Sequence, residues 1–206
     1  MKISITRKII TTAMLSAIAF VLMLFEFPLP FLIPSFVKMD FSDLPALLGS
    51  FAYGPVCGVI IEFIKNILHI VIKGTTSVYI GEMFNFLCGS FLCLTAGIVY
   101  YIKRTRKGAT IACIVGCLVM ALISLPLNYF VVYPSYIKLY GLSISQIVEL
   151  YENILKPISG FPTKNALFNC LLIFNLPFTF AKGFIDSVLC FIIYKPLSPI
   201  LHKTNR

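Results

Sequence analysis

The amino-acid sequence predicts an all-α, polytopic membrane protein with six transmembrane helices, forming a single domain over residues 1–206. Three observations support this fold class. Hydrophobic residues make up 59% of the chain, and the mean hydropathy is +0.94. Charged residues make up only 12%, whereas soluble domains carry roughly 25%. Several apolar stretches also reach the length of about 20 residues that a helix needs to cross the hydrocarbon core.

Four of these stretches are clear candidates for crossing helices, at roughly 9–27, 79–102, 109–132 and 168–194. The first could instead be the apolar part of a signal peptide, because basic residues precede it and it contains Ala17-Ile18-Ala19. We favour a retained helix, since the apolar run continues to Phe25.

A fifth stretch, roughly 44–72, reads either as one helix or as two helices that meet at Gly54-Pro55. The basic residues decide between these alternatives. They gather in three segments that contain no Asp or Glu: Lys2, Arg7 and Lys8; Lys103, Arg104, Arg106 and Lys107; and Lys195, Lys203 and Arg206. The positive-inside rule favours all three in the cytoplasm, which requires the break.

We therefore predict that the N- and C-termini are both cytoplasmic, with a tight cytoplasmic turn at Tyr53-Gly54-Pro55. Glycine gives the turn its freedom, and proline suits the first turn of the next helix. The second helix is then about ten residues long, too short to cross alone without tilt or support from its neighbours. The net charge of +9 reflects this topology and does not indicate nucleic-acid binding.

Two segments are predicted to lie outside. Residues 28–43 contain three prolines, so an irregular loop is expected. Residues 133–167 contain an amphipathic pattern near 143–156, capped by Ser143 or Ser145 and ended by Gly160 and Pro162.

Polar residues inside the apolar stretches fall on helical stripes. The last stretch carries Asn175, Thr179, Lys182 and Asp186 on one face, and Pro177 is predicted to kink it. A second stripe, on the helix predicted to end near residue 72, comprises Glu62, Lys65, Asn66 and His69 and continues to Lys73. The stretch 79–102 carries Glu82, Asn85 and Gly89, and Asn128 stands alone in the stretch 109–132.

These polar residues allow two interpretations. They can pair with each other, for example Lys182 with Asp186, or Glu62 with Lys65 or Asn66. They can instead line a ligand cavity, which we favour for Lys182 and Asn128, because an intramembrane lysine is costly. His69 is expected to be a packing or interfacial residue.

Motifs for catalysis or metal binding are absent from the sequence. The seven cysteines form no CxxC pair, and we expect them to be small buried hydrophobic residues. The acidic residues of the spans stand singly, which disfavours an intramembrane hydrolase, and nothing suggests a pore. The remaining class is a ligand-binding membrane subunit that draws its energy from partners. An intramembrane enzyme and a purely structural subunit remain as alternatives.

Several strings resemble the riboflavin-binding S components (RibU type) of energy-coupling factor (ECF) transporters. They run in the family's order over nearly the whole chain. They are AMLSAIAFVL (13–22), KMDFSDLPA (38–46), FAYGPVCG (51–58), KNIL (65–68), GEMFNF (81–86), LNYF (127–130) and LPFTFAKG (176–183).

The resemblance implies a six-helix S-component fold in the bacterial plasma membrane and riboflavin, or also FMN, as the transported ligand, with no resident cofactor. It implies that Asn128 and Lys182 hydrogen-bond the flavin, that Asn85 lies near its ring, and that Thr179 stands at a contact position. It places Met39, Asp40 and Phe41 in a loop that covers the ligand. An S component for another vitamin is the alternative.

The resemblance also implies partners, namely a transmembrane coupling protein and two cytoplasmic ATPases. Ala13 and Ala17 would form the surface that docks the coupling protein, since small residues four apart allow close helix approach. Two departures bear on ligand preference. Thr179 replaces the family's usual Asn, and the segment 133–167 is longer than expected.

Overall fold

The computed structural model describes residues 4–75, 77–141, 143–155 and 166–202, and most of these are helical. The helical elements are α1 (Ile5–Leu24), α2 (Asp43–Tyr53), α3 (Pro55–Ile72), α4 (Ile80–Ile102), α5 (Arg106–Leu127), η1 (Asn128–Val132), α6 (Tyr133–Tyr140), α7 (Ile144–Leu155), α8 (Ala166–Cys170), η2 (Leu171–Asn175) and α9 (Leu176–His202). The elements η1 and η2 are single π-helical turns.

The predicted break at Gly54 is confirmed. Gly54 has a φ of 100°, a conformation that favours glycine, and Pro55 opens α3. Helix α2 has 11 residues, about 16 Å of helix, roughly half the hydrocarbon thickness. Within the described ranges, five helical segments are long and apolar enough to cross a membrane, and α2 is not among them. The count of six crossings and their orientation stay predictions.

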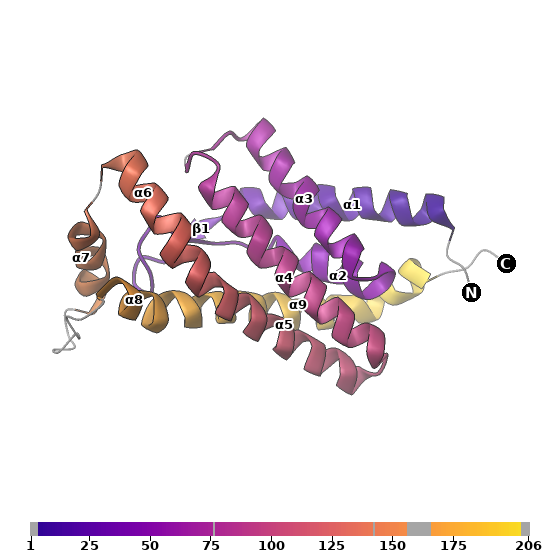
Figure 1. The fold of residues 1–206 in the computed structure, drawn as a ribbon. Coiled ribbons are helices and arrows are strands. Elements are labelled where there is room, and N and C mark those ends of the chain that lie inside the picture. The colour runs from indigo at the N-terminus through magenta and orange to yellow at the C-terminus, as the bar shows by residue number, and fades with distance from the viewer. Residues whose placement is uncertain (1–3, 76, 142, 156–165, 203–206) are drawn as a thin grey trace.

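The bundle has two distinct ends. The start of α1, the connection between α4 and α5 and the end of α9 lie at one end, and β1 and α7 lie towards the other (Figure 1). We call the second the distal end. The described basic residues at the start of α1 and in the connection between α4 and α5 thus lie at one end of the molecule. This arrangement supports the predicted orientation.

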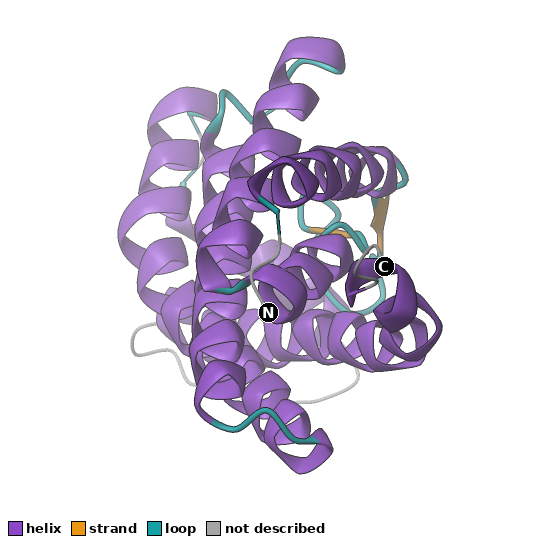
Figure 2. Cartoon of the chain, turned by 90° about the vertical axis from the view of Figure 1, so that its right-hand side faces the viewer, coloured by secondary structure: helices purple, strands orange, loops and turns teal. Residues whose placement is uncertain are grey.

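The segment 28–43 contains more order than the sequence predicts. Strands β1 (Phe27–Pro28) and β2 (Lys38–Met39) pair antiparallel, with Phe27 opposite Met39. Figure 2, viewed from the end that carries the chain termini, shows these two short strands among the helices. The intervening residues form turns, so the segment folds back before it enters α2.

The prediction that 133–167 is an outward loop is wrong at its start. The fifth span continues through η1 and α6 as one apolar helical segment from Arg106 to Tyr140. The amphipathic helix is confirmed as α7. Ser143 caps it, because the Gln146 N–H donates to Ser143 Oγ and the Ser143 N–H donates to Gln146 Oε1, a reciprocal capping box. The predicted stop at Gly160 and Pro162 lies outside the described residues.

The two π turns share a position relative to proline. Turn η1 ends two residues before Pro134, and η2 ends two residues before Pro177. Proline lacks an N–H and cannot continue the α-helical hydrogen-bond ladder, and π turns often occur at functional sites. At Pro177, where the sequence predicts a kink, the structure has this turn. Asn128 opens η1 and Asn175 closes η2.

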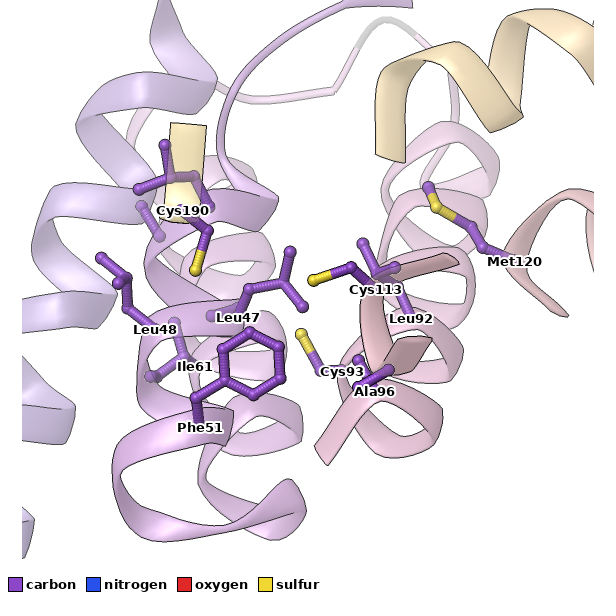
Figure 3. Packing of buried hydrophobic residues seen from close by; sticks show 14 of the residues in the cluster. Leu47, Leu48, Phe51, Ile61, Leu92, Cys93, Ala96, Cys113, Met120 and Cys190 are labelled. Carbon is purple, nitrogen blue, oxygen red and sulfur yellow. The ribbon is translucent and has the colours of Figure 1, made fainter. Parts of the chain in front are cut away.

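The core lies between α2, α3, α4, α5 and α9. Leu47, Ile61 and Leu92 are fully buried in it together with several cysteines (Figure 3). All seven cysteines are buried and free, as expected for small hydrophobic residues. The outer helix faces are apolar too, for example at Ile9, Met14 and Ile18 of α1, which are 63%, 61% and 49% exposed. Such faces suit lipid as the surrounding solvent.

Candidate functional site

A network of buried charges lies where the short helix α2 begins. Lys65, in the middle of α3, is fully buried and forms ion pairs with Asp43 at 2.5 Å and with Glu62 at 2.7 Å. Its ammonium also donates to Ser42 Oγ at 2.7 Å. The predicted pairing of Glu62 with Lys65 is therefore confirmed. Asp43 joins the pair because it stands in the first turn of α2, where a helix favours negative charge.

Lys182 of α9 belongs to the same network. Its Nζ lies 3.0 Å from Asp40 Oδ2 and 3.3 Å from Asp43 Oδ2. The alternative pairing of Lys182 with Asp186 is not observed, because the start of α2 brings two nearer carboxylates to the ammonium. Asp186 is buried, and neither of its oxygens has a hydrogen-bond partner in the described part of the chain.

Asp40 holds the segment 28–43 to this network. Its Oδ1 accepts hydrogen bonds from the backbone N–H and the hydroxyl of Ser42. Burial opposes ionisation of the carboxyl, but the charges of Lys182 and Lys65 and the Ser42 hydrogen bonds outweigh it. They hold the pKa of Asp40 well below its usual value. Asp40 is thus a fixed negative charge beside Lys182.

The network fits because Gly89 leaves room for it. A Cβ atom at Gly89 would lie 2.4 Å from Glu62 Oε2, well inside van der Waals contact. Gly89 is therefore needed at this position of the predicted polar stripe, because any larger residue would occupy the space of the Glu62 carboxylate.

A cavity of about 160 Å³ opens beside the network. Five of the residues predicted to bind ligand line it: Asp40, Asn85, Asn128, Thr179 and Lys182. Each of them except Asn85 is buried, with an exposed fraction below 8%. Apolar walls come from residues such as Met120, Phe84 and Phe178. A flat apolar ligand with polar edges suits such a site.

The two other predicted cover residues do not line this cavity. Met39 is buried at 4% exposure in β2. Phe41 packs its ring against Phe27, with ring centroids 6.1 Å apart. Lys38 and Asp40 line the cavity, whereas Met39 and Phe41 do not. The alternation of an extended segment explains this, because neighbouring residues point to opposite sides.

The sequence reasoning missed a polar triad on one wall. Tyr151 of α7 donates to Asn175 Oδ1 at 2.6 Å, and Asn175 Nδ2 donates to the Tyr133 hydroxyl at 3.3 Å. The hydroxyls of Tyr133 and Tyr151 also form a hydrogen bond. The amphipathic pattern places Tyr151 on the buried face of α7, but only the fold brings α7 to η2. The triad fixes Asn175 on the cavity wall.

The distal end of the cavity carries further polar residues. Glu26 accepts hydrogen bonds from Lys38 at 2.6 Å and from Lys73 at 2.7 Å, which ties the strand segment to α3. Partial burial opposes ionisation of Glu26, but the two lysines lower its pKa overall. Glu82 Oε2 accepts from Thr75 at 3.0 Å and from Ser77 at 2.9 Å.

The predicted docking residues lie elsewhere. Ala13 and Ala17 are exposed on the outer face of α1 and do not line the cavity. The same face carries Met14 and Ile18. Two small residues four apart therefore leave a shallow strip between larger apolar side chains.

Comparison with known proteins places this architecture. The profile of the family described as ECF transporter, substrate-specific component, matches residues 7–194. The chain is 35% identical to the riboflavin transporter RibU of Staphylococcus aureus (strain TCH60), over 96% of this chain and 93% of that protein. It is 32% identical to the riboflavin transporter FmnP of Bacillus subtilis (strain 168), over 96% and 95%.

A solved structure, described as "Structure and mechanism of the S component of a bacterial ECF transporter", matches the fold. Its TM-score is 0.73 at 33% identity, covering 97% of this chain and 99% of that one. The relatives of this chain are named as transporters, as predicted, and not as enzymes. The chain is a multi-pass membrane protein of the ECF transporter family and belongs to its substrate-specific, or S, components.

Proposed function

We propose that this chain captures riboflavin outside the bacterial plasma membrane and delivers it to the cytoplasm together with an ATP-driven ECF module. Riboflavin is the cargo, and the chain needs no cofactor. The observation that carries the proposal is the cavity beside Asn128, Thr179 and Lys182. Its relatives from Staphylococcus aureus and Bacillus subtilis, named as riboflavin transporters, support the choice of ligand.

The chemistry of this part of the cavity suits an isoalloxazine ring. Asn85, Asn128, Thr179 and Lys182, which we call the deep set, all carry N–H or O–H donors. The pyrimidine edge of the flavin presents two carbonyl oxygens and N1, which accept these hydrogen bonds, and an N3–H, which an asparagine side-chain oxygen can accept. A polar contact fixed in this way contributes about 1–3 kcal/mol, or roughly tenfold to a hundredfold in affinity. Phe84 and Met120 offer apolar surface to the ring face.

The partners follow from the same proposal. The strip around Ala13 and Ala17 would dock a transmembrane coupling protein, and two ATPases would supply the energy. Only small side chains let two helices approach closely within a membrane, and the exposure of both alanines supports this assignment. The cavity lies away from this strip, so ligand binding and docking are separable.

A fluorescence titration tests the ligand. The protein is purified in detergent after removal of bound flavin and titrated into riboflavin, whose emission is quenched when the ring is buried. Saturable quenching with one ligand per chain is expected. A protein that leaves riboflavin fluorescence unchanged would overturn the proposal. A parallel thermal-shift panel of FMN and other vitamins would then identify a different cargo of the same S-component mechanism.

A further inference from the structure

His69 is a buried polar residue of the cavity wall that the proposed flavin contacts do not use. It lies in the last turn of α3 and is only 5% exposed. It lines the cavity, and neither ring nitrogen has a hydrogen-bond partner anywhere in the described ranges. A buried polar group without a partner costs free energy. A packing role, which the sequence suggests, leaves this cost unexplained.

Glu82 defines the orientation of the imidazole. Its Oε1 lies 3.6 Å from His69 Nδ1, and its Oε2 is held by the hydroxyls of Thr75 and Ser77. A carboxylate beside one ring nitrogen favours the proton on that nitrogen. With the proton on Nδ1, Nε2 of the neutral ring is a hydrogen-bond acceptor.

The two ends of the cavity differ in their hydrogen-bonding groups. The deep set presents donors beside the Asp40 carboxylate. At the distal end Glu26 and Glu82 already accept from lysine and hydroxyl donors, so His69 is the polar side chain of this end that has no hydrogen-bond partner in the described residues. Along α4 the lining runs from Gly81 to Cys88, a rise of about 10 Å, so His69 and the deep set lie at different depths of the cavity.

We propose that His69 is a specificity-determining residue, whose Nε2 accepts a hydrogen bond from a hydroxyl of a polyol chain on the ligand, with Glu82 as its positioning residue. This inference rests on the proposed function, because riboflavin supplies such a chain as its ribityl group. A hydroxyl of such a chain is a donor for the unpaired ring nitrogen of His69. The distal end then selects for the hydroxylated chain, and the deep set holds the ring.

Two flavins separate this role from a structural one. Riboflavin and lumiflavin share the ring, but lumiflavin has a methyl group in place of the ribityl chain. The full-length protein is titrated with each flavin by fluorescence quenching. The variants are His69→Phe, which keeps a ring and removes the acceptor, His69→Gln, which restores one, and Glu82→Gln. The deep-set variant Lys182→Met is the matched control.

The expected pattern is selective. His69→Phe should weaken riboflavin binding about tenfold to a hundredfold and leave lumiflavin binding unchanged, which also shows that the variant is folded. His69→Gln should recover most of the riboflavin affinity, and Glu82→Gln should lose part of it. Lys182→Met should weaken both flavins alike.

Other outcomes would overturn the inference. Equal losses for the two flavins in His69→Phe would mean that His69 only supports the fold, and no loss for either would mean that it does not contact ligand. Wild-type protein that binds neither flavin would overturn the proposed function itself, and the polyol assignment with it.

Discussion

Lys182 offers the sharpest test of how the charge network serves the cavity. Lys182→Met keeps the length and apolar stem of the side chain and removes its charge. The change breaks the ion pairs with Asp40 at 3.0 Å and Asp43 at 3.3 Å. Breaking a buried ion pair by removing one partner costs about 3–5 kcal/mol of folding stability.

The structure places the expected loss near the lower end of that range. Asp43 keeps its ion pair with Lys65, and Asp40 keeps the two hydrogen bonds from Ser42. We therefore expect a destabilisation of about 3 kcal/mol. Riboflavin would lose a charged donor, which contributes about 1.5–3 kcal/mol, equivalent to roughly 10- to 150-fold in Kd.

Thermal unfolding in detergent and flavin titration measure the two effects separately. The double variant Lys182→Met/Asp40→Asn removes the stranded carboxylate, so it should recover part of the stability but none of the affinity. A double-mutant cycle with Asp40→Asn gives the coupling energy of the pair. The reasoning fails if Lys182→Met unfolds at the wild-type temperature and binds riboflavin within a factor of three of wild type.

Four further predictions follow from other contacts. Lys65→Met should destabilise the protein by about 3–5 kcal/mol in chemical unfolding, because it strands the buried Glu62 and leaves Asp43 with Lys182 alone; wild-type stability would contradict the network. Gly89→Ala should lower the Tm, since its Cβ would meet Glu62 Oε2 at 2.4 Å and overpacking costs about 1–3 kcal/mol; an unchanged Tm would mean that Glu62 can move. Ala17→Leu should leave the riboflavin Kd unchanged and abolish co-purification with the coupling protein; retained co-purification would remove α1 from the interface. The Tm difference between wild type and Glu26→Gln should stay constant from pH 8 to pH 5 and disappear as the pH falls below the usual carboxyl value of about 4.3, because a lowered folded pKa contributes stability only above that value; a difference that disappears near pH 6 would contradict the lowered pKa of Glu26.

Much of the fold could be predicted because membrane solvent constrains sequence strongly. Apolar length marked the spans, and the basic segments required the break that Gly54 makes with its φ of 100°. The stripe Asn175, Thr179, Lys182 and Asp186 is buried throughout, since helical periodicity alone decides which residues share a face. The prediction was wrong at 133–140, where polar and aromatic residues looked like a loop but continue the fifth helix.

The candidate site was less predictable, because its contacts join segments distant in sequence. Lys182 was expected to line the cavity, which it does, but its ion pair with Asp40, 142 residues away, could not be read from the sequence. No local pattern predicts the triad of Tyr133, Tyr151 and Asn175, which the docking of α7 creates. His69 looked like a packing or interfacial residue, and only the fold shows that it lines the cavity beside Glu82 without a hydrogen-bond partner in the described residues.

The sequence by itself determined that this chain is embedded in a membrane, that its helical run breaks at Gly54, and which polar residues face the interior of the bundle. These properties depend on hydrophobicity, backbone freedom and helical period, which are local. The tertiary structure alone decided which buried charges neutralise each other and where a cavity remains. Those outcomes depend on how the start of α2 packs between α3 and α9, and on Gly89 leaving space for Glu62. Differences of a few ångströms in helix packing decide which charges pair and where the cavity lies. These distances join residues far apart in the sequence, so no local pattern predicts them.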